Sequence, residues 1–148
     1  MLIDKQDLPI VDMNFMNEVH IEDIEIINEI FRLILVCETT PNETNQQNIE
    51  IQYKKWFNHT VDHFQGEEIK MKELSFPPYE FHKGEHDKAL AEMNAVFKQW
   101  QESKDIKILK IYFIEVLPNW LIQHIQSMDA VTATFFKTGQ SPCSAGIC

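Results

Sequence analysis

The sequence is poor in glycine, cysteine and basic residues, and it lacks any long hydrophobic run. Its 148 residues include only 4 glycines, which together with a hydrophobic content of 44% favours a well-packed helical protein over a disordered chain. No segment approaches the length of a membrane span, and Asp4 and Lys5 break the apolar start, which argues against a secretory signal. We therefore expect one cytoplasmic domain with a core of its own.

The 3 cysteines of a chain without a signal segment indicate a reducing compartment and not a disulfide framework. Cys37 ends an apolar helical pattern and is predicted to be a core residue. Cys143 and Cys148 lie in a segment with the composition of irregular structure. Two interpretations of this pair stand: a redox-sensitive or soft-metal-binding pair, or two incidental thiols in a loosely ordered tail, which is the favoured one.

Acidic residues outnumber basic ones by 23 to 13, and the net charge is −10. This excess argues against nucleic acid and anionic membrane surfaces as partners. Most of the acidic side chains are predicted to form a solvated surface. A few buried carboxylates, however, would serve to neutralise bound metal ions.

Hydrophobic periodicity predicts four helices, over about 14–37, 46–74, 79–101 and 104–136. Pro41 ends the first helix and the Pro77-Pro78 pair ends the second, because proline disfavours helical backbone at the residue before it. Pro118 falls inside the fourth pattern and predicts a kink there. Helices of this length with short connections make an all-α, antiparallel up-down-up-down four-helix bundle over residues 1–137, followed by a flexible tail over 138–148.

The stripes that should face the core of this bundle also carry most of the histidines. A stripe at helical spacing turns one face toward the neighbouring helices, and facing helices of a bundle can build a metal site between them. Residues of the four predicted inward stripes are His20, Ile24, Ile27, Phe31 and Ile34; Trp56, His59, His63 and Glu67; His82, His86, Ala89, Met93, Val96 and Trp100; and Phe113, Leu117, Trp120, His124 and Met128.

Seven possible metal ligands face the predicted interior, and burying them without partners would be costly. Seven donors exceed the four of a structural zinc site, so two ions that share bridging carboxylates are expected. Imidazole and carboxylate without thiolate favour iron or manganese over copper(I), while zinc stays open. A metal-free interaction module would need the whole set to be coincidence. The seven are His20, His63, Glu67, His82, His86, His124 and Asp129.

The order of these residues resembles the hemerythrin family, particularly the stand-alone bacterial hemerythrins. The pattern is a lone His, then His-x-x-x-Glu, then His-x-x-x-His, then His-x-x-x-x-Asp, and the flanking residues Phe64, Glu68, Trp120, Leu121 and Ile125 agree with it. The resemblance runs from about Phe15 to Phe136. Each motif is weak by itself, but together they are specific.

The resemblance implies a non-haem di-iron centre, usually with an oxo or hydroxo bridge. His82, His86 and His124 would hold one iron, and His20 and His63 would hold the other. By the same likeness, Glu67 and Asp129 would bridge the two ions, and dioxygen would bind at the more open iron, beside His20 and His63.

Reversible dioxygen binding requires a dry apolar pocket. The resemblance implies that Phe64, Trp120, Leu121 and Ile125 line it, although each of them taken singly fits an ordinary core position better.

Three positions depart from the family pattern or lie outside it. Asp23 stands where related oxygen carriers commonly have an apolar residue. Because it lies at the edge of its stripe, it is expected to face solvent. An inward Asp23 would instead favour peroxide chemistry or faster autoxidation. Ala89 replaces a frequent aromatic and would widen the pocket. An inward Asp23 and His59 are both candidates to contact the metal ligands from behind, and His59 is alternatively a histidine at the edge of the core.

From these observations we expect a protein that binds dioxygen reversibly, for storage, delivery or sensing, and that is not primarily a catalyst. The alternative is a di-iron redox enzyme or sensor on the same scaffold, peroxidase-like or responding to nitric oxide or iron, for which Asp23, Ala89 and the tail cysteines are the motivation. The oligomeric state is left open.

Overall fold

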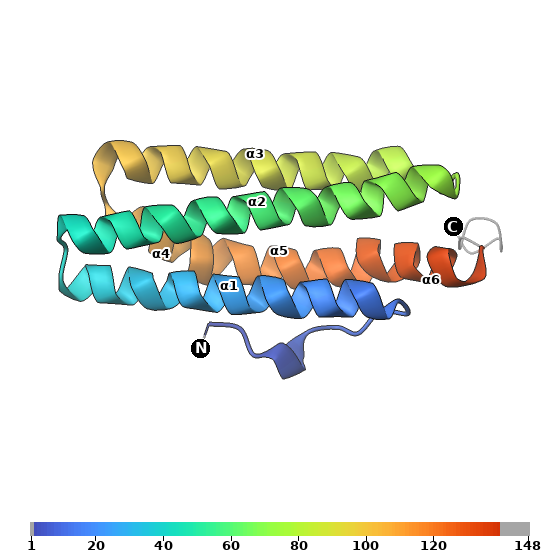
Figure 1. The fold of residues 1–148 in the computed structure, drawn as a ribbon, viewed down its shortest axis with the longest axis horizontal. Coiled ribbons are helices and arrows are strands. Elements are labelled where there is room, and N and C mark those ends of the chain that lie inside the picture. The colour runs from blue at the N-terminus through green and yellow to red at the C-terminus, as the bar shows by residue number, and fades with distance from the viewer. Residues whose placement is uncertain (1, 140–148) are drawn as a thin grey trace.

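The computed structural model describes residues 2–139, and these form an all-α, antiparallel four-helix bundle (Figure 1). The first three helices are α1 (Asn14–Thr39), α2 (Glu43–Glu73) and α3 (Tyr79–Ser103). The fourth is one long helix made of α4 (Ile106–Ile111), α5 (Leu117–His124) and α6 (Ala130–Thr138), joined by the π-helical turns η2 (Tyr112–Val116) and η3 (Ile125–Asp129). The predicted bundle is confirmed, whereas residues 140–148, with Cys143 and Cys148, lie outside the described range.

Local chemistry sets the ends of the helices close to where the sequence predicts them. The Asn42 side chain caps α2 by accepting a hydrogen bond from the backbone N–H of Asn45 at 2.8 Å. Lys104 ends α3 in the left-handed conformation with φ 54°, so the predicted start of the fourth helix at Lys104 is two residues early. Asp105 then caps α4 by accepting from the N–H of Lys107 at 3.0 Å.

The sequence predicts a kink at Pro118, and in the structure the regular α-helix is interrupted by η2 just before this proline. Proline has no N–H, and its ring collides with the carbonyl four residues earlier in a regular helix. The chain resolves this conflict by widening one turn, so that the N–H of Leu117 donates to the carbonyl of Tyr112, five residues back.

A short N-terminal segment, with the 3-10 turn η1 (Lys5–Asp7), runs along the outside of α1 (Figure 1). Two asparagines of α1 hold it: the Asn28 amide both donates to and accepts from the backbone of Ile3, and Asn17 does the same with Val11, all at 2.9 Å. Hydrophobic periodicity does not predict the position of this N-terminal segment, because side-chain amides hold it in place.

The half of the bundle near the α1–α2 and α3–α4 connections is filled by aromatic and aliphatic side chains. Trp100 and Phe113 are fully buried there, and the hydroxyl of buried Tyr53 donates to the carbonyl of Met93 at 2.7 Å. Cys37 is buried in the same core, as predicted. This apolar half excludes water from one side of the polar cluster described below.

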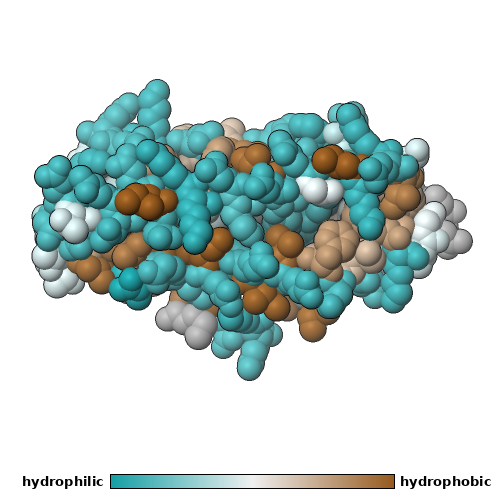
Figure 2. Space-filling model, viewed as in Figure 1, coloured by the Kyte–Doolittle hydropathy of each residue, from teal (hydrophilic) through white to brown (hydrophobic). Residues whose placement is uncertain are grey.

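Hydrophilic side chains cover most of the face shown in Figure 2, with hydrophobic patches between them. Within residues 2–139, no helix is both long enough and apolar enough to cross a membrane.

Candidate metal centre

Helices α2 and α3 each present two of the predicted ligands at i,i+4 spacing and α1 presents His20 alone, but the fourth helix uses a different device. His124 and Asp129 are five residues apart, which in a regular α-helix would place them about 140° apart around the axis. The π turn η3 widens the helix between them, and the N–H of Ala130 donates to the carbonyl of Ile125, five residues back. Asp129 thereby returns to the face of His124, and both are buried. Met128, which was predicted to face inward, is only half-buried for the same reason.

The first group of converging side chains joins α2, α3 and the fourth helix, and we call it the first donor set. Its members each offer one ligand atom, and these atoms all lie within 4.8 Å of one another. Nε2 of His82 and Nε2 of His124 both lie 3.1 Å from Oδ1 of Asp129. Nε2 of His82 and of His86 lie 3.5 Å from Oε1 of Glu67. The first donor set consists of Glu67, His82, His86, His124 and Asp129.

The second donor set, beside the first, consists of His20, His63 and Glu67. Nε2 of His63 lies 2.8 Å from Oε2 of Glu67. Nε2 of His20 lies 2.9 Å from Oδ2 of Asp129, which therefore borders this set too. All seven side chains that the sequence singled out thus meet in one place.

Each of the two carboxylates divides its oxygens between the two donor sets. Glu67 turns Oε1 toward His82 and His86, and Oε2 toward His63. Asp129 turns Oδ1 toward the first donor set and Oδ2 toward His20. A carboxylate arranged in this way is able to bridge two ions.

The donor atoms satisfy a test for metal ligands that does not depend on family likeness. In the described part of the chain, seven buried side-chain atoms have no hydrogen-bond partner, and five of them are the ligand atoms of the first donor set. The nitrogen–oxygen contacts among these five atoms measure 3.1–3.5 Å, but the angles of these contacts do not meet the criteria for hydrogen bonds. The atoms therefore point toward a common centre. Buried polar atoms are rarely left without a partner. A metal ion at that centre would satisfy all five.

The charges of the cluster suit cations. Burial raises the pKa of Asp129, but the surrounding His124, His20 and His82 rings outweigh it and hold the pKa well below its usual range. Burial and Asp129 raise the pKa of Glu67, yet its contacts with His63 and His86 lower it overall. Both carboxylates are therefore ionised at neutral pH, as metal ligands must be.

Two outer partners of the first donor set were missed at the sequence level. Nδ1 of His82 lies 2.7 Å from Oγ1 of Thr132, and Nδ1 of His86 donates to Oε2 of Glu68 at 2.8 Å. Partners of this kind orient a ligating imidazole. Thr132 lies one turn after Asp129 and faces inward only because of η3, so no simple periodicity would have found it. Glu68 is next to the inward Glu67, a position that a regular stripe assigns to its edge.

Of the two orientations that the sequence left open for Asp23, the structure shows the inward one and not the slightly favoured exposure to solvent. It is buried in α1, on the stripe that runs from His20 to Ile24 and Ile27. Oδ2 accepts a hydrogen bond from Nδ1 of His63 at 2.9 Å, and Oδ1 accepts one from Nδ1 of His59 at 2.7 Å. Hydrogen bonds from two histidines make the burial of this carboxylate tolerable, which a stripe of apolar residues does not reveal.

These contacts also explain the ionisation of the two histidines. Burial lowers the pKa of His63, but its bonds to Asp23 and Glu67 outweigh burial and raise the pKa well above the ordinary value. The bond to Asp23 raises the pKa of His59, whose Nε2 reaches the exposed Glu22 at 3.2 Å. His59 therefore contacts Asp23 and Glu22 and no member of the donor sets directly.

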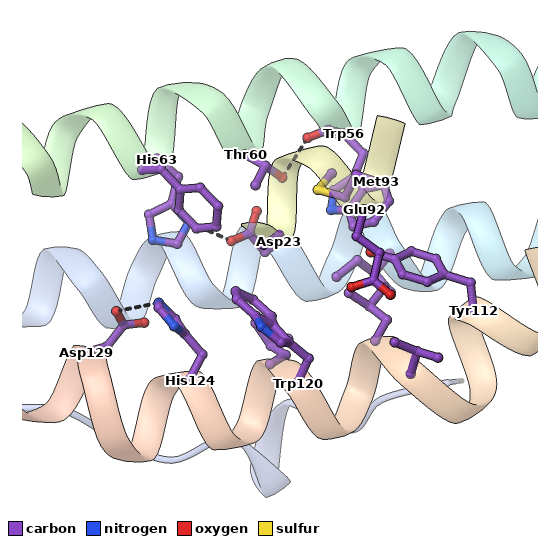
Figure 3. A pocket seen from close by; sticks show the side chains of 16 residues that line it. Asp23, Trp56, Thr60, His63, Glu92, Met93, Tyr112, Trp120, His124 and Asp129 are labelled. Carbon is purple, nitrogen blue, oxygen red and sulfur yellow. Dashed lines mark hydrogen bonds and ion pairs between the residues drawn. The ribbon is translucent and has the colours of Figure 1, made fainter. Parts of the chain in front are cut away.

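A cavity of about 30 Å³ opens next to the centre, and Figure 3 shows Asp23, His63, His124 and Asp129 at one end of it. Mainly apolar residues, among them Trp56 and Met93, form its remaining wall, while Glu92 and Tyr112 mark the other end. Of the predicted pocket residues, Phe64, Trp120 and Leu121 line this cavity; Ile125 is fully buried and does not. Ala89 also lines it.

Comparison with known proteins supports the likeness suggested by the sequence. The chain is 26% identical over 133 residues to a bacteriohemerythrin of Aquifex aeolicus (strain VF5), a match that covers 90% of this chain and 96% of the relative. It is 34% identical over 77 residues to a bacteriohemerythrin of Ralstonia nicotianae, covering 52% of this chain and 55% of that protein. No family model and no solved structure matches the chain. The chain is therefore a homologue of bacteriohemerythrin, a hemerythrin-like protein with a buried histidine and carboxylate cluster suited to two metal ions.

Proposed function

We propose that this protein is a non-haem di-iron protein that binds dioxygen reversibly, for storage, delivery or sensing. The observation that carries the proposal is the division of Glu67 and Asp129 between two sets of histidines. His82, His86 and His124 would hold one iron, and His20 and His63 the other, with the two carboxylates as bridges. When bound, a pair of ferrous ions supplies the electrons that reversible dioxygen binding requires.

The two positions are unequal, which favours a ligand-binding role over a purely structural one. The first donor set offers three histidines, whereas the second offers two. A metal position with fewer protein ligands keeps room for an external ligand. The cavity touches His63 of the second donor set and His124 and Asp129 of the first, so an external ligand would reach the centre through it.

The cavity has the size and lining for a small ligand. Its volume of about 30 Å³ corresponds to one or two small molecules. The rings of Phe64 and Trp120 and the side chain of Leu121 give the cavity an apolar wall beside the centre. Phe64 also stacks on His86 with ring centroids 3.8 Å apart, which holds the wall and the ligand ring together.

The test is metal analysis combined with optical spectra of the purified chain. We expect two irons per chain, near-ultraviolet bands of oxo-bridged iron in the oxidised protein, and a visible spectrum that appears with dioxygen and vanishes under vacuum over several cycles. Glu67→Ala should abolish the spectrum, while Glu73→Ala at the end of α2 is the matched control and should preserve it. Fewer than one iron per chain, or no reversible spectrum in the parent protein, would refute the proposal.

A second candidate function is supported by one observation, the inward position of Asp23 at the cavity wall. A carboxylate there would favour replacement of the bound ligand, as in a peroxidase-like enzyme or a redox sensor. Both of its oxygens are engaged by His59 and His63, which is why we rank this function second. Stopped-flow mixing of the reduced protein with dioxygen distinguishes them: a long-lived oxygenated protein supports the carrier, and immediate oxidation with turnover of added hydrogen peroxide supports the enzyme.

A further inference from the structure

The outward nitrogens of the ligand histidines are supported unequally. In the first donor set, Thr132 contacts His82 and Glu68 accepts a hydrogen bond from His86, while Nδ1 of His124 has no hydrogen-bond partner among the described residues. In the second donor set, Nδ1 of His20 has no hydrogen-bond partner among the described residues, and only His63 is supported, by Asp23. One carboxylate therefore provides the whole outer support of the second donor set.

Asp23 is itself held in place. Its Oδ1 accepts from His59, whose other ring nitrogen contacts Glu22 at the surface. Asp23 is buried in α1 while His59 and His63 both come from α2, so the three side chains fasten these neighbouring helices at the level of the site. Figure 3 shows the bond between Asp23 and His63 at the cavity.

The geometry defines what the bond does to His63. A carboxylate only accepts hydrogen bonds, so Nδ1 of His63 carries the proton that points to Asp23. Nε2, which contacts Oε2 of Glu67 at 2.8 Å in the metal-free protein, is then the nitrogen that gives up its proton and offers its lone pair to a metal. Asp23 thus selects the tautomer of the ring, fixes its rotation and places a negative charge behind it, all of which strengthen an imidazole as a ligand.

We propose that Asp23 is a positioning residue for His63 that selectively secures the second metal ion of the pair, with His59 as its anchor. The inference rests on the proposed di-metal function and adds to it the residue that controls how the second position is filled. Loss of an outer partner weakens metal binding by about 10- to 100-fold in comparable sites. The effect is confined to one ion because Asp23 contacts no ligand of the first donor set.

The test is a stepwise titration of the metal-free protein with Co²⁺ alone, followed by visible absorption and by counting bound metal per chain after desalting. Co²⁺ follows Fe²⁺ in the affinity order of divalent ions. We expect the parent protein to bind two ions, the tighter one in the first donor set. Asp23→Ala should leave the first step unchanged and weaken the second by about 10- to 100-fold.

Glu68→Ala is the matched control, because it removes the carboxylate partner of a ligand in the other donor set. It should weaken the first step instead of the second. Asp23→Asn keeps the shape and an acceptor oxygen for His63, and should restore most of the second step. An equal loss in both steps for Asp23→Ala, or no rescue by asparagine, would overturn the positioning role.

Melting of each metal-free variant, followed by circular dichroism, separates a local effect from a loss of fold. If Asp23→Ala does not fold, His59→Ala decides the matter, since His59 is partly exposed and its removal releases only the anchor. That variant should weaken the second step less than tenfold and leave the first unchanged; an unaltered second step would refute the inference. If the parent protein binds fewer than two ions, both the proposed di-metal function and this inference are refuted. If every variant binds two ions as tightly as the parent does, only the inference is refuted.

Discussion

Removal of bound metal should lower the melting temperature of this protein by about 10 to 20 °C. Five buried ligand atoms of the first donor set have no hydrogen-bond partner within residues 2–139. An unsatisfied buried polar atom costs about 1–3 kcal/mol, and water entering the vacated site relieves part of that cost, so the lower end gives about 5 kcal/mol for the set. For a chain of this size, 1 kcal/mol corresponds to about 2–4 °C.

The assay is calorimetric melting of the protein after anaerobic treatment with a chelator, before and after addition of two equivalents of Fe²⁺. The control is a double variant, His82→Leu with His86→Leu, that lacks two ligands of the first donor set. Its melting temperature should not respond to Fe²⁺. Its metal-free form should melt below the metal-free parent, because the buried carboxylates Glu67 and Asp129 lose histidine partners.

Two results would refute this reasoning. Metal-free and loaded parent proteins that melt within about 3 °C of each other would show that the ligand atoms are not destabilising without metal. An equal response of the double variant to Fe²⁺ would show that the stabilising ion binds elsewhere.

Three further predictions concern the cavity, the protonation of the cluster and the apolar half of the bundle. Ala89 lines the cavity, so the larger side chain of Ala89→Leu should fill part of it, destabilise the protein by about 1–3 kcal/mol in urea unfolding and slow azide binding to the oxidised protein; unchanged azide kinetics would contradict the assigned route. Burial alone lowers the pKa of His63, but its carboxylate partners raise it well above the ordinary value, so the protonated ring stabilises the metal-free protein fully below about pH 6.5 and this contribution is lost as the pH rises through the raised pKa. Metal binding should therefore release a proton and strengthen with rising pH, which calorimetric titration in two buffers of different ionisation enthalpy measures; equal heats in both would contradict it. Tyr53→Phe removes the buried hydrogen bond to Met93 and should cost about 0.5–1.5 kcal/mol, with iron content unchanged; a loss of iron would show that the two halves of the bundle are coupled.

Much of the site was accessible from the sequence because helical spacing is a local property. His82 and His86 lie one turn apart on any regular helix, and so do His63 and Glu67. Apolar residues at the same spacing indicate which face is buried, and so they also indicate that these histidines face the core. Four such helices with short connections leave few topologies other than an antiparallel bundle.

Asp23 shows where that reasoning stops. On α1 it lies at the edge of the stripe, where burial and exposure are equally compatible with the spacing. What buries it is the presence of His59 and His63 on α2, which supply hydrogen bonds that offset its desolvation. Two residues from another helix decided its orientation, and no pattern within α1 contains that information.

The four helices, their buried faces and the set of side chains that the interior must accommodate were predictable, because they follow from spacing along one helix and from the cost of burying polar groups. The folded bundle was needed to show which oxygen of Glu67 and of Asp129 faces which histidines, how η3 returns Asp129 to the face of His124, and which outer partners hold the rings. Those features depend on distances of a few ångströms between helices. Such distances are set by the packing of the whole core, to which every helix contributes.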